Sequence, residues 1–112
     1  MQYALLIYAE PGYDDGLTDA QREAAALDYS ALGDDPRCVS SSQLHPVEAA
    51  TCVRVDGTRT LVTDGPFADT KEVLGGLALI EADNLDEAIE MAARIPAARL
   101  DGVVEIRPVV QR

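Results

Sequence analysis

A carboxylate and an ammonium group lie close together in the segment TDGPFADTKEVLGG, residues 63–76. Asp64 could act as a general acid or base, and Lys71 could hold an anionic group of a small molecule. Lys71 is the one lysine beside eight arginines, which indicates a role for a compact ammonium with a tunable pKa. Both residues also have a structural interpretation, because Asp64 suits a turn and Lys71 could pair on the surface with Asp69 or Glu72.

Small and apolar residues of the same segment could line a pocket beside these groups. They are Gly65, Phe67, Gly75 and Gly76. Phe67 is the one phenylalanine of the chain, and we expect it to be a buried anchor for the loop. The glycine pair opens a strand and predicts a β-bulge or the close approach of a backbone or ligand. The segment is therefore predicted to wall a cleft.

His45 is the one histidine of the chain, and histidine is the type of side chain that most often transfers protons near neutral pH. With Asp64 it forms the candidate acid/base pair, although His45 could equally be an exposed loop residue without a partner. Tyr8 and Glu10 end the first predicted strand and could face the same opening as ligand-binding residues. Tyr29 of the first predicted helix could also reach it.

The composition of the 112-residue chain indicates one domain, residues 1–112, with 47% apolar residues. The net charge is -11 and no cluster of Lys and Arg occurs, so we expect no direct nucleic-acid binding and no attraction to anionic membranes. The longest apolar run, Tyr3–Ala9, is too short to span a membrane. It also lacks the flanks of a signal peptide, so the expected location is the cytoplasm.

No motif for a cofactor or metal is present. The sequence has neither GxGxxG nor a P-loop. Cys38 and Cys52 stand alone, without the further ligands that zinc needs, and we expect both to be reduced.

Hydrophobic periodicity and turn residues predict six strands and two helices. Thr18 caps the first helix with Gln21, and Gly33 should end it. Asn84 caps the second helix. The expected elements are a strand over 2–11, a helix over 17–33, a strand over 37–44, a hairpin over 50–55 and 58–64, a strand over 74–83, a helix over 84–96 and a strand over 102–110.

Apolar stripes should face the core from both helices. The expected positions are Leu17, Ala24, Leu27, Ala31 and Leu32 in the first helix, and Leu85, Ala88, Ile89, Ala92 and Ala93 in the second. Without the hairpin, the element order is β-α-β-β-α-β. This order predicts a ferredoxin-like α+β fold with an inserted β-hairpin.

The first strand is apolar on both faces, with Tyr3, Leu5 and Ile7 on one and Ala4, Leu6 and Tyr8 on the other. The strand around Leu77–Ile80 repeats this pattern. Two helices can cover only one face of such a sheet, and the other would be a large apolar patch. We therefore expect a homodimer whose two sheets pack face to face.

Two registers are open for the hairpin. A turn at Asp56-Gly57 places Arg54 opposite Arg59, whereas a turn at Gly57-Thr58 places Asp56 opposite Arg59. The turn preference of Asp-Gly favours the first register. Charge pairing favours the second, because opposite charges across a strand pair are favourable and like charges are not.

Several motifs resemble the DGPF-type branch of the YciI-like family. They are the opening YALLIYAE, the hairpin ATCVRVDGTRTLVTDGPF and the string DGPFADTKE, and the similarity covers nearly the whole chain. The resemblance implies a dimeric α+β barrel of ferredoxin-like protomers with a largely undefined biochemical role. Shorter members have a proposed catalytic His-Asp pair with its histidine in the first helix. This chain has no histidine there, so it departs from that pattern.

Three hypotheses follow for the function. The first is a small-molecule enzyme that catalyses an isomerisation, elimination or hydrolysis by acid/base chemistry in a cleft near the dimer interface. The second is a non-catalytic ligand-binding module with the same cleft. The third is a regulatory partner protein, possible because genes of this branch often lie beside sigma-factor-like genes.

Overall fold

A computed structural model describes residues 1–111, and its elements follow the predicted order. The strands and helices are β1 (Gln2–Ala9), α1 (Asp19–Asp34), β2 (Cys38–Gln43), β3 (Thr51–Asp56), β4 (Arg59–Asp64), β5 (Val73–Glu81), α2 (Leu85–Ala93) and β6 (Gly102–Pro108). One-turn helices lie at Tyr13–Gly16, Val47–Ala49 and Pro96–Ala98.

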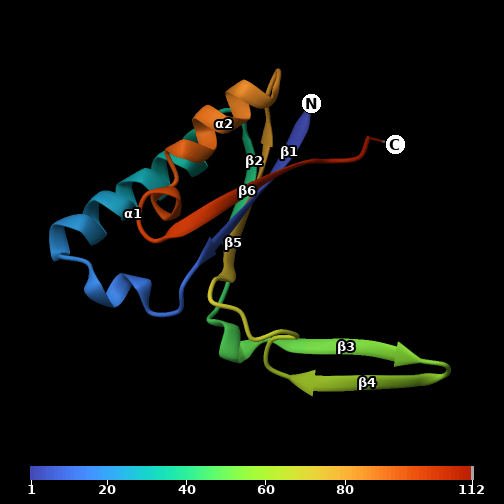
Figure 1. The fold of residues 1–112 in the computed structure, drawn as a ribbon. Helices are drawn as coiled ribbons and strands as arrows, with labels where there is room; N and C mark the ends of the chain where they lie inside the picture. The colour runs from blue at the N-terminus through green and yellow to red at the C-terminus, as the bar shows by residue number, and fades with distance from the viewer. Residues whose placement is uncertain (112) are drawn as a thin grey trace.

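Four strands form an antiparallel sheet in the order β2-β5-β1-β6. Both helices cover the same face of this sheet (Figure 1). This arrangement confirms the predicted ferredoxin-like α+β fold, and β3 and β4 form the inserted hairpin as a separate two-stranded ladder.

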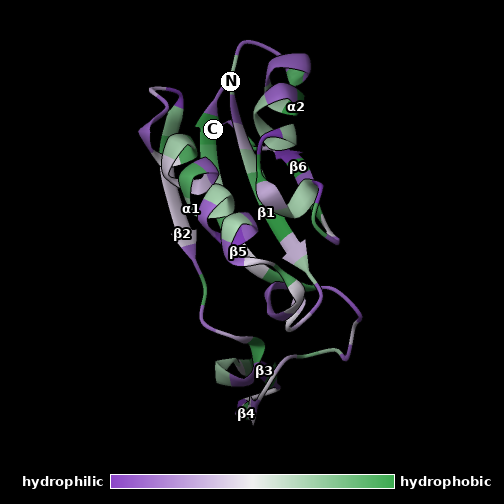
Figure 2. Ribbon diagram, turned by 90° about the vertical axis from the view of Figure 1, so that its left-hand side faces the viewer, coloured by the Kyte–Doolittle hydropathy of each residue, from purple (hydrophilic) through white to green (hydrophobic). Residues whose placement is uncertain are grey.

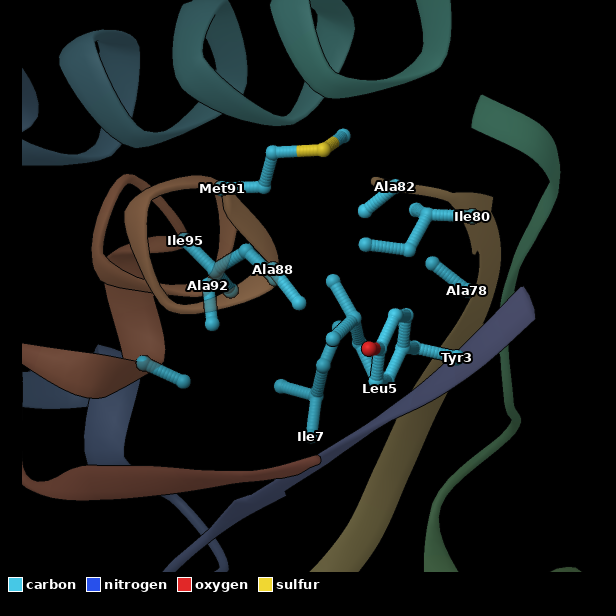
Figure 3. Packing of buried hydrophobic residues seen from close by; sticks show 11 residues of the cluster. Tyr3, Leu5, Ile7, Ala78, Ile80, Ala82, Ala88, Met91, Ala92 and Ile95 are labelled. Atoms are coloured by element: carbon cyan, nitrogen blue, oxygen red, sulfur yellow. The ribbon is translucent and has the colours of Figure 1, made fainter. Parts of the chain in front are cut away.

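The core lies between the sheet and the helices, as Figure 3 shows. Alternate residues of β1 and β5 point toward the helices, since side chains alternate along a strand. They meet the buried side of α2 and the turn that follows it. The buried set is Tyr3, Leu5, Ile7, Ala78, Ile80, Ala82, Ala88, Met91, Ala92, Ile95 and Ala97.

The predicted helix starts are confirmed. Thr18 accepts from the backbone N–H of Gln21, whose side chain accepts from the N–H of Thr18. Asn84 accepts from the N–H of Glu87. The predicted end of the first helix was wrong, because α1 continues through Gly33 to Asp34.

The predicted stripe of α1 was right for Leu32 and wrong for Leu27. Leu27 is 67% exposed, while Tyr29 and Leu32 pack against the core. An alanine-rich helix offers two apolar faces, and the sheet binds the one with the larger side chains. In α2 the buried residues are Ala88, Met91 and Ala92, so the expected inward orientation of Leu85 and Ile89 was wrong and both are exposed.

The hairpin register favoured by charge pairing is confirmed. Asp56 lies opposite Arg59, and Val53 lies opposite Val62. Gly57 has a φ of 61°, the left-handed value that a type II′ turn needs at its first central position.

Candidate functional site

The face of the sheet away from the helices is apolar along β1 and β5 and carries polar side chains on the edge strands β2 and β6. Neither helix covers this face. The β1 residues Ala4, Leu6 and Tyr8 alternate with the buried ones and are half-buried. Leu77 of β5 lies opposite Leu6 and is 38% exposed, and Val103 of β6 lies opposite Tyr8 and is 47% exposed. We call this surface the open face.

A tyrosine and a carboxylate are hydrogen-bonded on the open face. The hydroxyl of Tyr8 donates to Oε1 of Glu105 at 3.3 Å. Glu105 lies on β6 opposite Leu6, so the carboxylate projects among apolar neighbours. Sequence reasoning missed Glu105. The signal was the alternation in GVVEIRP, which puts Glu105 on the face opposite Val104 and Ile106.

The structure brings together two other predicted site residues, Glu10 and Lys71. Nζ of Lys71 lies 3.8 Å from Oε1 of Glu10, just beyond the carboxyl end of β1. The expected surface partners of Lys71 were Asp69 or Glu72, and Glu10 takes that place instead. The lysine side chain is 81% exposed, so its ammonium can reach a bound anion.

Asp64 ends β4 opposite Thr51, and the turn after it is well ordered by backbone contacts. Gly65 has a φ of 91° and donates its N–H to the carbonyl of Ala50 at 2.7 Å. The expected burial of Phe67 was wrong, because this side chain is 81% exposed. Its loop leaves the sheet, and no apolar surface of the chain reaches it.

His45 and Asp64 are both exposed and lie on the two chain segments that lead into and out of the hairpin. His45 takes part in no hydrogen bond or ion pair within residues 1–111. Their acid/base pairing therefore stays a prediction. Tyr29 packs against the core on the helix side, where burial raises the pKa of its hydroxyl to about 12, so it does not reach the open face.

The two glycines of β5 differ. Gly75 is the extra residue of a bulge, since Ile7 lies opposite Gly76 and Tyr8 opposite Leu74. A Cβ on Gly76 would approach the carbonyl oxygen of Ser42 to 3.1 Å. The prediction of a bulge and a close approach is confirmed. Gly76 is buried, so the glycine pair leaves no open space at this position.

Two small hollows of the described chain lie away from residues 63–76. One of about 120 Å³ separates α1 from α2, between Leu32 and Arg94. Another of about 260 Å³ lies between α2 and β6, beside Ile89 and Val103. Both are below the roughly 300–1,000 Å³ typical of ligand pockets, and neither is lined by residues 63–76.

A charged cluster joins the helices on the covered side. Arg37 donates two hydrogen bonds to Asp35, at 3.0 and 2.8 Å, and one to Glu87 at 3.0 Å. These hydrogen bonds lower the pKa of Asp35 to about 2 and also lower the pKa of Glu87. The cluster ties the end of α1 to the start of α2, which is a structural role.

Cys38 and Cys52 are free cysteines and form no disulfide bond. In the part of the chain that the structure describes, no group of three or more His, Cys, Asp or Glu could hold a metal ion. No helix within residues 1–111 is long and apolar enough to cross a membrane.

The fold and the open face define the class, a ferredoxin-like α+β domain with a hairpin inserted before β5. The model of the YCII-related domain matches residues 1–112, and the chain belongs to this family. It is also similar to an uncharacterised protein of Rhizobium meliloti. The two are 35% identical over 115 residues, which cover 96% of this chain and 91% of the relative.

Proposed function

We propose that the protein acts as a homodimer that binds a small anionic molecule between two open faces and performs acid/base chemistry on it. The observation that carries the proposal is the hydrogen-bonded pair of Tyr8 and Glu105, which lies next to the apolar residues of β1 and β5, with Arg107 on the same face of β6. An apolar site with a few convergent polar groups is the usual composition of a small-molecule pocket.

Each polar group has a distinct role in this proposal. Glu105 accepts a proton from the substrate or returns it, and the Tyr8 hydroxyl orients the carboxylate. Lys71, next to Glu10, holds the anionic group. Asp64 and His45 are the remaining acid/base candidates, at the base of the hairpin. The reaction class is isomerisation, elimination or hydrolysis, which needs proton transfer alone.

A second copy supplies the enclosure that the single chain lacks. The open face would be an exposed apolar patch in a monomer. Packing against the same face of a second copy would cover it with a layer about 10 Å thick. Burial of this kind would also strengthen the electrostatic effect of Glu105 on a bound molecule.

Sedimentation equilibrium tests the dimer with two leucine variants. Leu77→Asp places a charge on the open face and should give a monomer, because an unpaired carboxylate is costly to bury. Leu27→Asp is the matched control, since this leucine is exposed on the outer side of α1 and the variant should remain dimeric. A wild-type monomer at micromolar concentration would overturn the proposal.

Thermal shift with a panel of small carboxylates and phosphates, followed by turnover assays on the hits, tests the site. Glu105→Gln should lower turnover by roughly 10²–10⁴-fold, the usual contribution of a general acid or base. Glu90→Gln, on the exposed side of α2, should have no effect. Binding without turnover would indicate a non-catalytic ligand-binding module. Full activity in Glu105→Gln would show that Glu105 takes no part in the mechanism.

Asp64→Asn and Lys71→Arg test the opening segment on the same hits. The asparagine keeps most hydrogen bonds of the turn, and the arginine keeps the charge but changes its shape and hydration. Loss of binding or turnover with normal stability would place the segment in the site. Full function in both variants would show that the segment of residues 63–76 has a structural role only.

A further inference from the structure

The β3–β4 hairpin has one apolar face that nothing in the described chain covers. Val53 and Val62 lie opposite each other and are 61% and 63% exposed. Val55 lies two residues from Val53 on the same face and is 69% exposed. We call Val53, Val55 and Val62 the valine face.

The opposite face of the hairpin is mainly polar. Arg54 lies there opposite Leu61, and Asp56 lies opposite Arg59. A two-stranded hairpin with no further packing is marginally stable in water. The strands nevertheless continue for six residues each, so the valine face needs an external partner.

The hairpin points to the side of the sheet that the helices leave free. Figures 1 and 2 place both helices on one side and the hairpin beyond the end of the sheet, directed to the other side. The hydrogen bond from Gly65 to Ala50 and the contact of the Cys52 thiol with the Gly65 carbonyl at 3.2 Å join the two ends of the hairpin to each other at its base. The hairpin therefore flanks the space in front of the open face.

We propose that this hairpin is an arm that packs its valine face on the second copy of the chain. The proposal rests on the homodimer of the proposed function. Six residues per strand give a reach of ~20 Å. Packed sheets lie ~10 Å apart, so the arm extends past the plane of the partner's sheet.

The contact area favours a second copy with the arm included. From strand spacing and rise, four strands of about eight residues give the open face a footprint of ~500 Å² and one hairpin face adds ~200 Å². A standard interface buries ~800 Å² on each partner. The sheet alone falls well short of this value, and the arm closes most of the difference. The arm contact occurs twice in a two-fold dimer, because each copy contributes one arm.

The chemistry of the arm also fits a second copy. Homodimer interfaces are more apolar than other interfaces. The valine face is apolar, and the hairpin extends to the side of the sheet on which the open face lies. A single partner copy can cover both surfaces at once. The arm of the partner copy makes the same contact on the first copy.

Sedimentation equilibrium on two neighbouring substitutions of β4 tests the arm. Val62→Asp changes the valine face and should weaken the dimer by at least about tenfold. Thr63→Asp introduces the same charge on the opposite face and should change the dissociation constant by less than about threefold. Both positions are exposed in the single chain, so neither variant should impair folding, which circular dichroism checks.

Hydrogen exchange of the wild-type chain gives an independent measurement. Amides of β3 and β4 should be protected from exchange at high protein concentration. They should lose this protection when the protein is diluted below the dissociation constant of the dimer. The arm proposal would be wrong if Val62→Asp and Thr63→Asp changed the dissociation constant equally. It would also be wrong if the hydrogen-exchange rates of the hairpin amides did not change on dilution. If Leu77→Asp dissociates the dimer while Val62→Asp does not, the homodimer stands and only the arm fails. A wild-type monomer defeats both.

Discussion

The two faces of the main sheet carry similar residues in opposite environments. Leu5 and Leu6 are neighbours in β1, yet Leu5 is 0% exposed beneath the helices and Leu6 is half-buried on the open face. The chain supplies two helices, and both lie on one side. The comparison teaches that the two helices of the chain cover one face of this sheet and leave the other face without a packed layer.

The largest expected effect separates these neighbouring leucines. Leu5→Ala should lower the free energy of unfolding by about 2–5 kcal/mol, because it leaves a cavity in a packed core. Leu6→Ala should cost less than half as much at protein concentrations too low for association. Urea denaturation measures both. Equal losses in dilute protein would break the comparison between the faces.

The adjacent glycines of β5 sharpen the comparison further. Gly76→Ala should cost about 1–3 kcal/mol, because the new methyl group approaches the Ser42 carbonyl and must displace a backbone. Gly75→Ala should stay within about 0.5 kcal/mol, since the nearest atom to its Cβ is 4.0 Å away. Thermal denaturation of the two variants gives the order, and a reversed order would contradict the packing described for Gly76.

The caps of the two covering helices come next in size. Asn84→Ala should cost about 1 kcal/mol, because it removes the cap of α2, whose residues Ala88 and Met91 are buried in the core. Thr18→Ala should cost less, since none of the residues of α1 is fully buried. Urea unfolding of both variants measures the difference. A larger loss for Thr18→Ala would show that α1 is the main cover.

The smallest effect depends on pH. The pKa of Asp35 falls from 3.8 to about 2 on folding, chiefly through the hydrogen bonds from Arg37. A lowered folded pKa contributes stability above the unfolded pKa, and that contribution is lost as the pH falls toward the folded value. The stability advantage of wild type over Arg37→Ala should therefore shrink between pH 3.8 and about 2. An advantage that stays constant through this window would contradict the assignment.

Local features of this chain were predictable from sequence, and features of burial were not. The caps at Thr18 and Asn84 depend on residues three apart, so the pattern suffices. Leu27 and Phe67 were predicted to be buried and are exposed, because burial depends on which surface another element occupies. Glu105 was missed because it meets Tyr8 only when β1 and β6 pair.

The sequence by itself determined the order of elements, the ferredoxin-like class and the family, and it reduced the hairpin to two registers. These properties follow from periodicity, turn chemistry, charge pairing and motifs, all of which act over short stretches of chain. Only the tertiary structure decided that Glu10 meets Lys71 and that Tyr8 meets Glu105. It also decided that the hairpin points to the side of the open face (Figure 1). Such contacts join residues distant in sequence, and they form only when the sheet fixes the relative positions of its strands.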